Sequence, residues 1–181
     1  FGFGHDGSVD SIARFLGGIG PDGHIAFNVR GSGFYSVTRL TQTNYETQAA
    51  AATDQGGMEI SRNRLVITIG LETITYNPTC TALVIAAGDA KASVAARAVQ
   101  EPKSPQAPAS VLQDLEGARF YLTRGAASEL IERKYEDLAA RESFDEETAD
   151  DIVIGVALNK KMPLHEIADD DMGADRFASL L

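Results

Sequence analysis

The chain has 181 residues, of which 44% are hydrophobic and 23% charged, a composition typical of soluble globular proteins. Its formal net charge of −10 argues against nucleic acid or an anionic membrane surface as a partner, so an anionic small ligand needs a local site of opposite sign. No apolar segment approaches the roughly 20 residues of a membrane span, and the first residues lack the basic region and apolar run of a signal peptide.

Cysteine and histidine are rare, and their positions limit the chemistry. The single cysteine, Cys80, forms no internal disulfide and lies in an apolar run, so we expect an inert core thiol and a reducing, cytoplasmic location. His5 and His165 stand alone and are expected at the surface, so we predict no metal and no cofactor. Because the first residue is not methionine, we expect the sequence to begin inside a longer gene product or to lack its start.

The first half of the chain alternates between strand-like and helix-like patterns. Ile12–Gly18 is a short apolar run that ends in glycines, and it predicts a buried strand. Ser36–Thr43 and Arg64–Gly70 are rich in β-branched residues and predict two more strands. Between them, Asn44–Ala52 begins with a helix-capping residue and continues in alanines, which predicts a helix.

The alternation continues to about residue 140. The elements expected there are a strand over Cys80–Gly88, a helix over Asp89–Gln100 capped by Asp89, a proline-rich surface loop over Glu101–Ser110, a strand over Ala118–Thr123 and a helix over Gly125–Ala140. Strands that alternate with helices favour an α/β fold, a Rossmann-like open and mostly parallel sheet with helices on both faces.

After Arg141 the sequence becomes acidic and helical in pattern, with no strand signal. Met162 and Pro163 are expected to separate two helices, and the acidic runs to form a solvated face. We therefore predict two domains, an α/β domain over residues 1–140 and an acidic helical extension over residues 141–181.

A glycine-rich loop follows the first predicted strand. Gly18–Gly23 satisfies the dinucleotide pattern G-x-G-x-x-G, but that site needs a long helix after its third glycine, and the sequence "VRGSG" interrupts any helix soon after. Gly2–Gly7 matches the same pattern with no strand before it. We therefore disfavour a dinucleotide site at either position.

Asp22 and His24 lie two residues apart in this loop, at the carboxyl end of a parallel strand, where open α/β sheets bind ligands. An imidazole is well suited to proton transfer near neutral pH, and a neighbouring carboxylate orients it. The alternative is a glycine-rich connection in which His24 is a buried structural histidine.

The loop "GGIGPDGHIAFN" resembles the active-site loop of the glucosamine-6-phosphate deaminase/isomerase family. The segments "TRLTQTNYETQAAAA", "LVITIGLETI", "LVIAAGDAKASVAARAV", "SVLQDL" and "ARFYLTRGAASEL" resemble successive parts of the same family. The resemblance extends from about Ile12 to Leu138 and leaves out the acidic tail.

The resemblance implies a chemistry. The family opens the ring of an amino-sugar 6-phosphate, moves a proton between C1 and C2, and releases ammonia to give fructose 6-phosphate. His24 would handle the ring-oxygen proton and Asp22 would support its imidazole electrostatically. Gly20, Gly23 and Asn28 are the other loop residues expected to contact this phosphorylated amino sugar.

Two basic residues match family positions. Lys91 corresponds to a phosphate-binding lysine, and its place in the first turn of a helix after Gly88 favours an anion independently. Arg39 corresponds to an arginine of an effector phosphate site at a subunit contact, although the companion lysine of that site is Thr41 here. Self-association as a homo-oligomer is expected from the resemblance alone.

The chain also departs from the family pattern. Val29 stands where the family has a glutamate of the carboxylate–histidine relay, and Thr53 lies near the place of a phosphate-site arginine. Leu115 stands where the family's Leu-Gln-x-His pattern has its histidine. The family's first half, which supplies the base for the C2 proton, is absent. We therefore expect a fragment that is inactive alone.

Two other functions remain open. A non-catalytic sugar-phosphate sensor fits the loss of the relay glutamate and the acidic extension. A phosphogluconolactonase-like hydrolase shares the fold and a Gly-x-Asp-Gly-His core, although "IAFN" is closer to the deaminase loop.

Overall fold

The computed structural model describes residues 11–181, so the expectations for His5 and for the Gly2–Gly7 pattern lie outside the described residues. The chain divides into two compact units, the first ending at Leu130 and the second spanning Ile131–Leu181. This division precedes the boundary expected after residue 140, because Leu138 packs against the apolar cluster of the second unit. Each unit is described by itself below.

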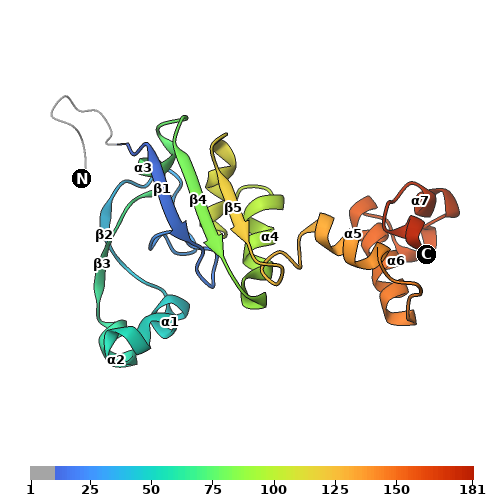
Figure 1. Ribbon diagram of the computed structural model, residues 1–181, viewed down its shortest axis with the longest axis horizontal. Coiled ribbons are helices and arrows are strands. Elements are labelled where there is room, and N and C mark those ends of the chain that lie inside the picture. The colour runs from blue at the N-terminus through green and yellow to red at the C-terminus, as the bar shows by residue number, and fades with distance from the viewer. Residues whose placement is uncertain (1–10) are drawn as a thin grey trace. The chain divides into compact units, whose positions relative to one another are not determined.

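A parallel sheet of three strands forms the centre of the first unit. Its strands are β1 (Arg14–Gly18), β4 (Thr81–Ala86) and β5 (Arg119–Leu122), which lie side by side in the order β1-β4-β5 (Figure 1). Gly18 pairs with Ile85, so the carboxyl ends of β1 and β4 meet at the same sheet edge. The predicted α/β class with a parallel sheet is confirmed, but the expectation of helices on both faces is wrong for the described residues of this unit, because its helices pack on one face and Leu16, Ile85 and Tyr121 on the other are exposed.

The other two predicted strands form a separate antiparallel pair, β2 (Arg39–Gln42) and β3 (Leu65–Thr68). Helices α1 (Tyr45–Gln55) and α2 (Met58–Arg62) connect them. The side chain of Asn44 accepts a hydrogen bond from the Thr47 backbone N–H at 3.1 Å, so the predicted helix cap is confirmed.

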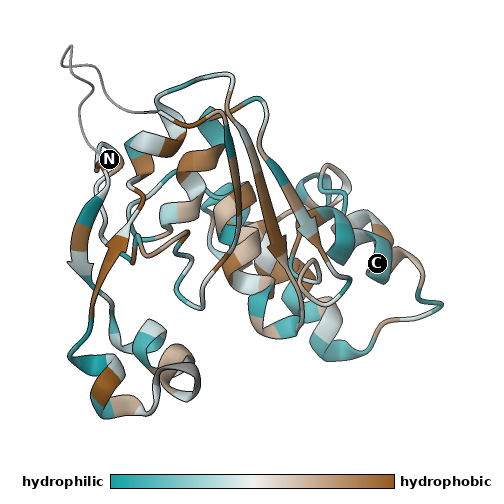
Figure 2. Ribbon diagram, turned by 60° about the vertical axis from the view of Figure 1, so that its left-hand side comes forward, coloured by the Kyte–Doolittle hydropathy of each residue, from teal (hydrophilic) through white to brown (hydrophobic). Residues whose placement is uncertain are grey.

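The core lies on one face of the parallel sheet. Alternate strand residues such as Phe15 and Val84 face α3 (Leu71–Thr75), α4 (Ala92–Gln100) and the 3-10 segment η2 (Pro108–Asp114). Figure 2 shows brown, hydrophobic segments along these strands. Cys80 is fully buried in this cluster, as expected of a core thiol, and its burial raises the pKa of the thiol.

Two expectations near the carboxyl end of β4 are wrong. Asp89 does not cap the following helix, because the short 3-10 turn η1 (Asp89–Lys91) intervenes, preceded by Gly88 with φ +85°, and α4 begins only at Ala92. The expected surface loop ends instead in the buried start of η2, since the small residues Pro108, Ala109 and Ser110 pack inside the core region.

The helix expected over Gly125–Ala140 begins later, as α5 (Ile131–Ala139). The preceding residues form turns, in which Ala126 is buried and Gly125 lies against Asp89. A Cβ at Gly125 would lie 2.0 Å from the Asp89 Oδ1 atom, so only glycine allows this close approach at the place where the helix was predicted to begin.

The second unit is helical throughout its described residues. After α5 come α6 (Glu146–Lys160), η3 (Leu164–Glu166), α7 (Asp169–Gly173) and η4 (Ala178–Leu180). Met162 and Pro163 lie between α6 and η3, as predicted, and the acidic residues of α6 are exposed. His165 is also exposed. None of the described helices has the length and apolar character needed to span a membrane.

Candidate functional site

The glycine loop folds tightly at the carboxyl end of β1. The Gly20 N–H donates to the His24 carbonyl at 2.9 Å, and the Gly23 N–H donates to the Gly20 carbonyl at 3.1 Å. Gly23 and Ala26 both have positive φ, +83° and +51°, and Ala26 is one of few non-glycine residues with this backbone conformation. A Cβ at Gly20 would lie only 1.9 Å from the His24 ring, so glycine leaves the space that the imidazole occupies.

Asp22 and His24 belong to a closed cycle of four buried or half-buried side chains. The imidazole Nδ1 of His24 pairs with Asp22 Oδ1 and lies 3.3 Å from the Thr47 hydroxyl. The Thr47 hydroxyl donates to Asn44 Oδ1 at 2.6 Å, and the Asn44 amide donates to Asp22 Oδ2 at 2.6 Å. Every member therefore holds its neighbour in orientation.

Asp22 is ionised in this cycle. Burial would raise the pKa of its carboxyl, but hydrogen bonds from His24, the Arg30 N–H and Asn44, with the charge of His24, outweigh burial and hold the pKa well below its usual range. An ionised carboxylate only accepts hydrogen bonds, so the proton between the two residues belongs to His24 Nδ1. The other ring nitrogen, Nε2, remains for a ligand.

His24 lines a cavity of about 590 Å³ between β1 and β3. Its walls are mostly apolar and come from Phe15–Gly20, Ala26, Phe27 and Ile67–Ile69. Gly20 also lines the cavity, whereas Asp22 lies buried behind the ring. A titratable side chain with a buried orienting partner, facing a mostly apolar cavity, is a suitable arrangement for proton transfer to a small ligand.

Asn28 and Arg39 contact each other rather than the cavity. Asn28 is fully buried, donates to the carbonyls of Ile25 and Ile69, and accepts from Arg39 Nη1 at 2.9 Å. Arg39 also donates to the Ser32 hydroxyl at 3.2 Å, and its burial lowers the pKa of the guanidinium. In this arrangement Asn28 joins the loop to β3.

Lys91 lies at the same edge of the sheet as the loop, just after the carboxyl end of β4 and directly before α4. It is half-buried, and the structure gives its ammonium no hydrogen bond or ion pair with any described residue. Lys91 and Gly23 are not among the residues that line the cavity around His24.

Val29, at the position of the family's relay glutamate, is half-buried. The following residue contacts the cycle through its backbone instead, as the Arg30 N–H donates to Asp22 Oδ2 at 3.0 Å. The side chain of Val29 offers no group that holds or moves a proton, so within the described part of this loop Asp22 and His24 are the candidate acid–base pair.

Sequence reasoning missed Asn44 and Thr47 as parts of the site. Both lie at the start of α1, about twenty residues after the loop, and only the capping role of Asn44 was expected. The cavity walls contributed by Ile67 and Ile69 were missed as well. Asn44 and Thr47 both lie in the segment "TQTNYET", which is part of a stretch that resembles the family, and this resemblance could have indicated them.

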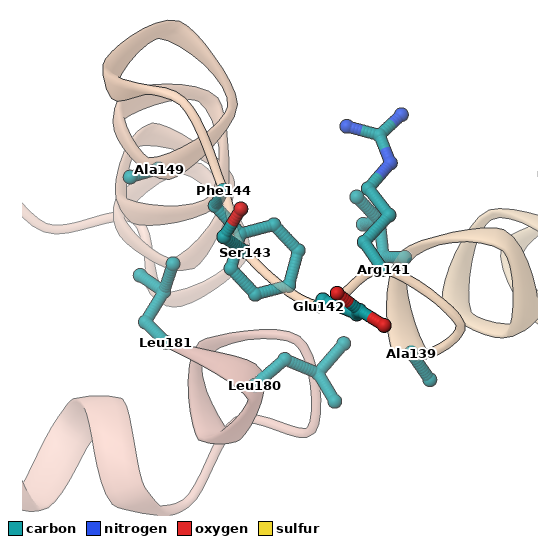
Figure 3. Close-up of a pocket in the computed structure, with 9 residues that line it drawn as sticks. Ala139, Arg141, Glu142, Ser143, Phe144, Ala149, Leu180 and Leu181 are labelled. Carbon is teal, nitrogen blue, oxygen red and sulfur yellow. The ribbon is translucent and has the colours of Figure 1, made fainter.

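A second pocket, of about 520 Å³, lies within the second unit and contains none of the predicted site residues. Figure 3 shows its lining, in which Phe144, Leu180 and Leu181 provide apolar surface and the Arg141 guanidinium extends away from them. Among its lining residues there is no buried titratable pair comparable with Asp22 and His24.

The fold and the candidate site define an α/β protein with a buried Asp22–His24 pair at the carboxyl edge of a parallel sheet, the edge at which open α/β sheets generally bind ligands. No family model matches the chain. The glucosamine-6-phosphate deaminases of Corynebacterium urealyticum and Rhodopirellula baltica are each 38% identical to it, over 118 and 116 residues, which are 65% and 64% of this chain. The solved structure of a monomeric glucosamine-6-phosphate deaminase aligns with a TM-score of 0.59 and 30% identity, over 68% of this chain and 48% of that one.

The chain is thus a homologue of glucosamine-6-phosphate deaminases, and the resemblance predicted from its sequence is confirmed. The matches cover 45% of each of the two curated relatives, so the chain spans about half the length of the proteins it matches.

Proposed function

We propose that this chain provides the ring-opening acid–base pair of a glucosamine-6-phosphate deaminase/isomerase, with a phosphorylated amino sugar as substrate. The observation that carries the proposal is the buried Asp22–His24 pair, whose imidazole faces a cavity at the carboxyl end of β1. The homology to glucosamine-6-phosphate deaminases supports the substrate class. Residues 1–140 are the proposed deaminase-like domain.

The pair suits the first step of the reaction. As the bond between C1 and the ring oxygen breaks, His24 Nε2 gives a proton to that oxygen and takes one from the C1 hydroxyl. Asp22, ionised and hydrogen-bonded to Nδ1, stabilises the imidazolium whenever the ring carries both protons. Proton removal from C2 needs another base, which the resemblance assigns to a part of the family absent here, so the chain alone is expected to be inactive.

We propose Lys91 for the phosphate, because its ammonium has no partner among the described residues and lies at the sheet edge that holds the loop. Gly20 and Gly23 would let the loop backbone approach the sugar, and Asn28 would fix the loop against β3. Arg39 remains a candidate for a second phosphate at a contact between copies.

Binding and turnover test this proposal separately. Glucosamine 6-phosphate should shift the ¹⁵N ring signals of His24 in this chain, whereas glucosamine should not. Lys91→Ala should raise the dissociation constant measured in this titration at least tenfold. In the gene product that contains this chain, His24→Ala should abolish ammonia release, whereas His165→Ala, a change at an exposed histidine, should leave it unchanged. Unchanged turnover in His24→Ala refutes the assignment.

The replacement at Val29 favours a second candidate, a sensor that binds the sugar phosphate without turning it over. Binding of glucosamine 6-phosphate with no ammonia release at high protein concentration supports the sensor. If the enzyme is merely weakened, Val29→Glu should raise the rate. Acid release from a phosphorylated sugar lactone supports the hydrolase alternative instead.

A further inference from the structure

Thr47 lies directly against the His24 ring, although the two residues are 23 positions apart in sequence. Its side chain comes from the first turn of α1, which Asn44 caps, and it is only 4% exposed. The Thr47 hydroxyl oxygen lies 3.3 Å from the imidazole Nδ1. Among the described residues, Asp22 and Thr47 are the polar side chains within hydrogen-bond distance of this ring.

The direction of each hydrogen bond in this group follows from the charge of Asp22. An ionised carboxylate only accepts, so Asn44 presents its NH₂ group to Asp22 and its oxygen to Thr47. That oxygen accepts from the Thr47 N–H at 3.1 Å and from the Thr47 hydroxyl at 2.6 Å. A hydroxyl has one hydrogen, so the Thr47 oxygen has only lone pairs left for His24. Both polar partners of Nδ1 are therefore acceptors, and Nδ1 carries the hydrogen.

The apolar surroundings of the ring leave its orientation open. Gly20 lies against the ring, and the Phe27 ring is tilted by only 24° from it with 6.4 Å between the centroids. Contacts of this kind do not distinguish a ring nitrogen from a ring carbon. A ring turned by half a rotation, or one with its hydrogen on Nε2, leaves Asp22 and Thr47 without a donor, and unpaired buried acceptors are costly. The two acceptors thus determine both the orientation and the tautomer.

We propose that Thr47 is a positioning residue for the ring-opening step and acts through His24. Its hydroxyl oxygen fixes the tautomer with hydrogen on Nδ1, so the lone pair of Nε2 stays available to the substrate. Thr47 does not line the cavity, so it touches the imidazole and not the sugar. The role in the reaction rests on the proposed function, whereas the tautomer is a property of this chain alone.

Two variants of Thr47 and a matched control separate this role from a structural one. Thr47→Val keeps the shape of the side chain and removes its oxygen, and Thr47→Ser keeps the oxygen. Thr148 has the same place in α6, where its N–H donates to the cap residue Asp145 at 2.8 Å, and it is also half-buried or less exposed than the residues around it. Thr148→Val therefore removes the same group from the same helix position, away from the site of His24.

The first measurement is the tautomer of His24 in this chain, read from the ¹⁵N signals of its two ring nitrogens at a pH at which the ring is neutral. Its signals are assigned by their loss in His24→Ala. Wild type should show the hydrogen on Nδ1. Thr47→Val should shift the tautomer ratio about fivefold toward hydrogen on Nε2, the effect of losing one hydrogen bond of ordinary strength. Thr47→Ser and Thr148→Val should keep the wild-type ratio.

The second measurement is ammonia release from glucosamine 6-phosphate by the gene product that contains this chain. Thr47→Val should lower kcat about fivefold with KM unchanged, because the base is less often in its active form while substrate contacts remain. Thr47→Ser should restore kcat. If His24→Ala keeps full turnover while Thr47→Val still shifts the tautomer, the proposed function fails and the assignment of the tautomer to Thr47 is supported.

Three outcomes overturn the proposal. The first is a wild-type spectrum with the hydrogen on Nε2. The second is an unchanged tautomer in Thr47→Val, even with lower stability or turnover, because Thr47 then serves only the start of α1. The third is an equal shift in Thr47→Val and Thr47→Ser, or in Thr148→Val, because the hydroxyl oxygen next to His24 is then not the cause.

Discussion

The loop around His24 and the helical second unit use polar residues in opposite ways. In the loop, Asp22 is 1% exposed and takes part in hydrogen bonds with three other residues. In the second unit the ion pairs, such as Lys160–Asp171 and Arg176–Glu132, lie at the surface and are open to water and salt. Buried polar groups are costly unless they are fully paired, so a protein retains them where their orientation matters.

The contrast supports the proposed location of the chemistry in the loop around His24. The pair Asp22 and His24 is held by its own loop and by the start of α1, which is distant in sequence, and the His24 ring faces a cavity. The Lys160–Asp171 pair joins α6 to α7, the Arg176–Glu132 pair joins α5 to the segment after α7, and both lie at the surface. If this distinction is correct, substitutions in the loop should cost far more than chemically similar ones in the second unit, and the following predictions are ordered by that cost.

The largest effect is expected for Asp22→Asn. The new amide has a single oxygen, so its NH₂ faces either the Nδ1–H of His24 or the N–H groups of Arg30 and Asn44, and one side of the site loses its acceptor. We expect a loss of about 2–3 kcal/mol in the free energy of unfolding at pH 7. Urea unfolding measures it, with the exposed Asp150→Asn as the control.

The same variant has a defined pH dependence. The pKa of Asp22 is lower in the folded than in the unfolded chain, so its stabilising contribution is present at neutral pH and declines below about 3.9, the ordinary aspartate value. The difference in the free energy of unfolding between wild type and Asp22→Asn should therefore become smaller as the pH falls through that range. A gap that stays constant down to pH 2 contradicts the ionised pair.

Gly20→Ala should have the next largest effect. The added methyl overlaps the His24 ring, which has to move away from its partner Asp22 or displace the loop. Overpacking of this kind costs about 1–3 kcal/mol. Gly33→Ala is the matched control, because an added Cβ there meets no atom within 4 Å.

Chemical denaturation measures both glycine variants, and ring ¹⁵N shifts report whether His24 keeps its hydrogen bond to Asp22. Equal stability of the two variants, together with an unchanged His24 signal, means that the ring does not occupy the space next to Gly20.

Asn44→Ala should cost about 1–2 kcal/mol, because it removes both the cap of α1 and a hydrogen bond to Asp22. Asn44→Ser separates the two roles, since serine retains a capping oxygen but has no amide to donate. In both variants the pKa of Asp22 should rise, as ¹³C carboxyl shifts measure. Asn63→Ala, at an exposed asparagine, is the control, and no rise in the pKa for Asn44→Ser excludes a role beyond capping.

The local parts of this fold could be predicted from sequence. Runs such as Thr81–Ala86 are apolar and bounded by turn residues, and Asn44 precedes a helix-forming segment, so short-range preferences determine them. The Asp22–His24 pair was also predictable, because the two residues are neighbours in a distinctive loop.

Contacts between distant segments could not be predicted. The second bond of Asn44, to Asp22, depends on where α1 lies, and the cavity wall at Ile67 and Ile69 depends on the pairing of β3 with β2. Gly125 shows the converse, as it lies close to Asp89 within turns where the sequence pattern favoured a helix. In each case tertiary packing decides between arrangements that are locally similar in energy.

The smallest effect is expected for Lys160→Met, which removes the ammonium that donates to Asp171 Oδ1 at 2.6 Å but keeps most of the aliphatic side chain. Because Asp171 also accepts from the Ala168 N–H, it remains partly satisfied, and the exposed pair is already weakened by water. The hydrogen bond from Lys160 lowers the pKa of Asp171, so that pKa should rise in the variant. The melting temperature should fall only slightly, and 1 M salt should remove the difference from wild type. A salt-resistant loss as large as that of Asp22→Asn contradicts the distinction between the two regions, because it means that the second unit also depends on a protected charge.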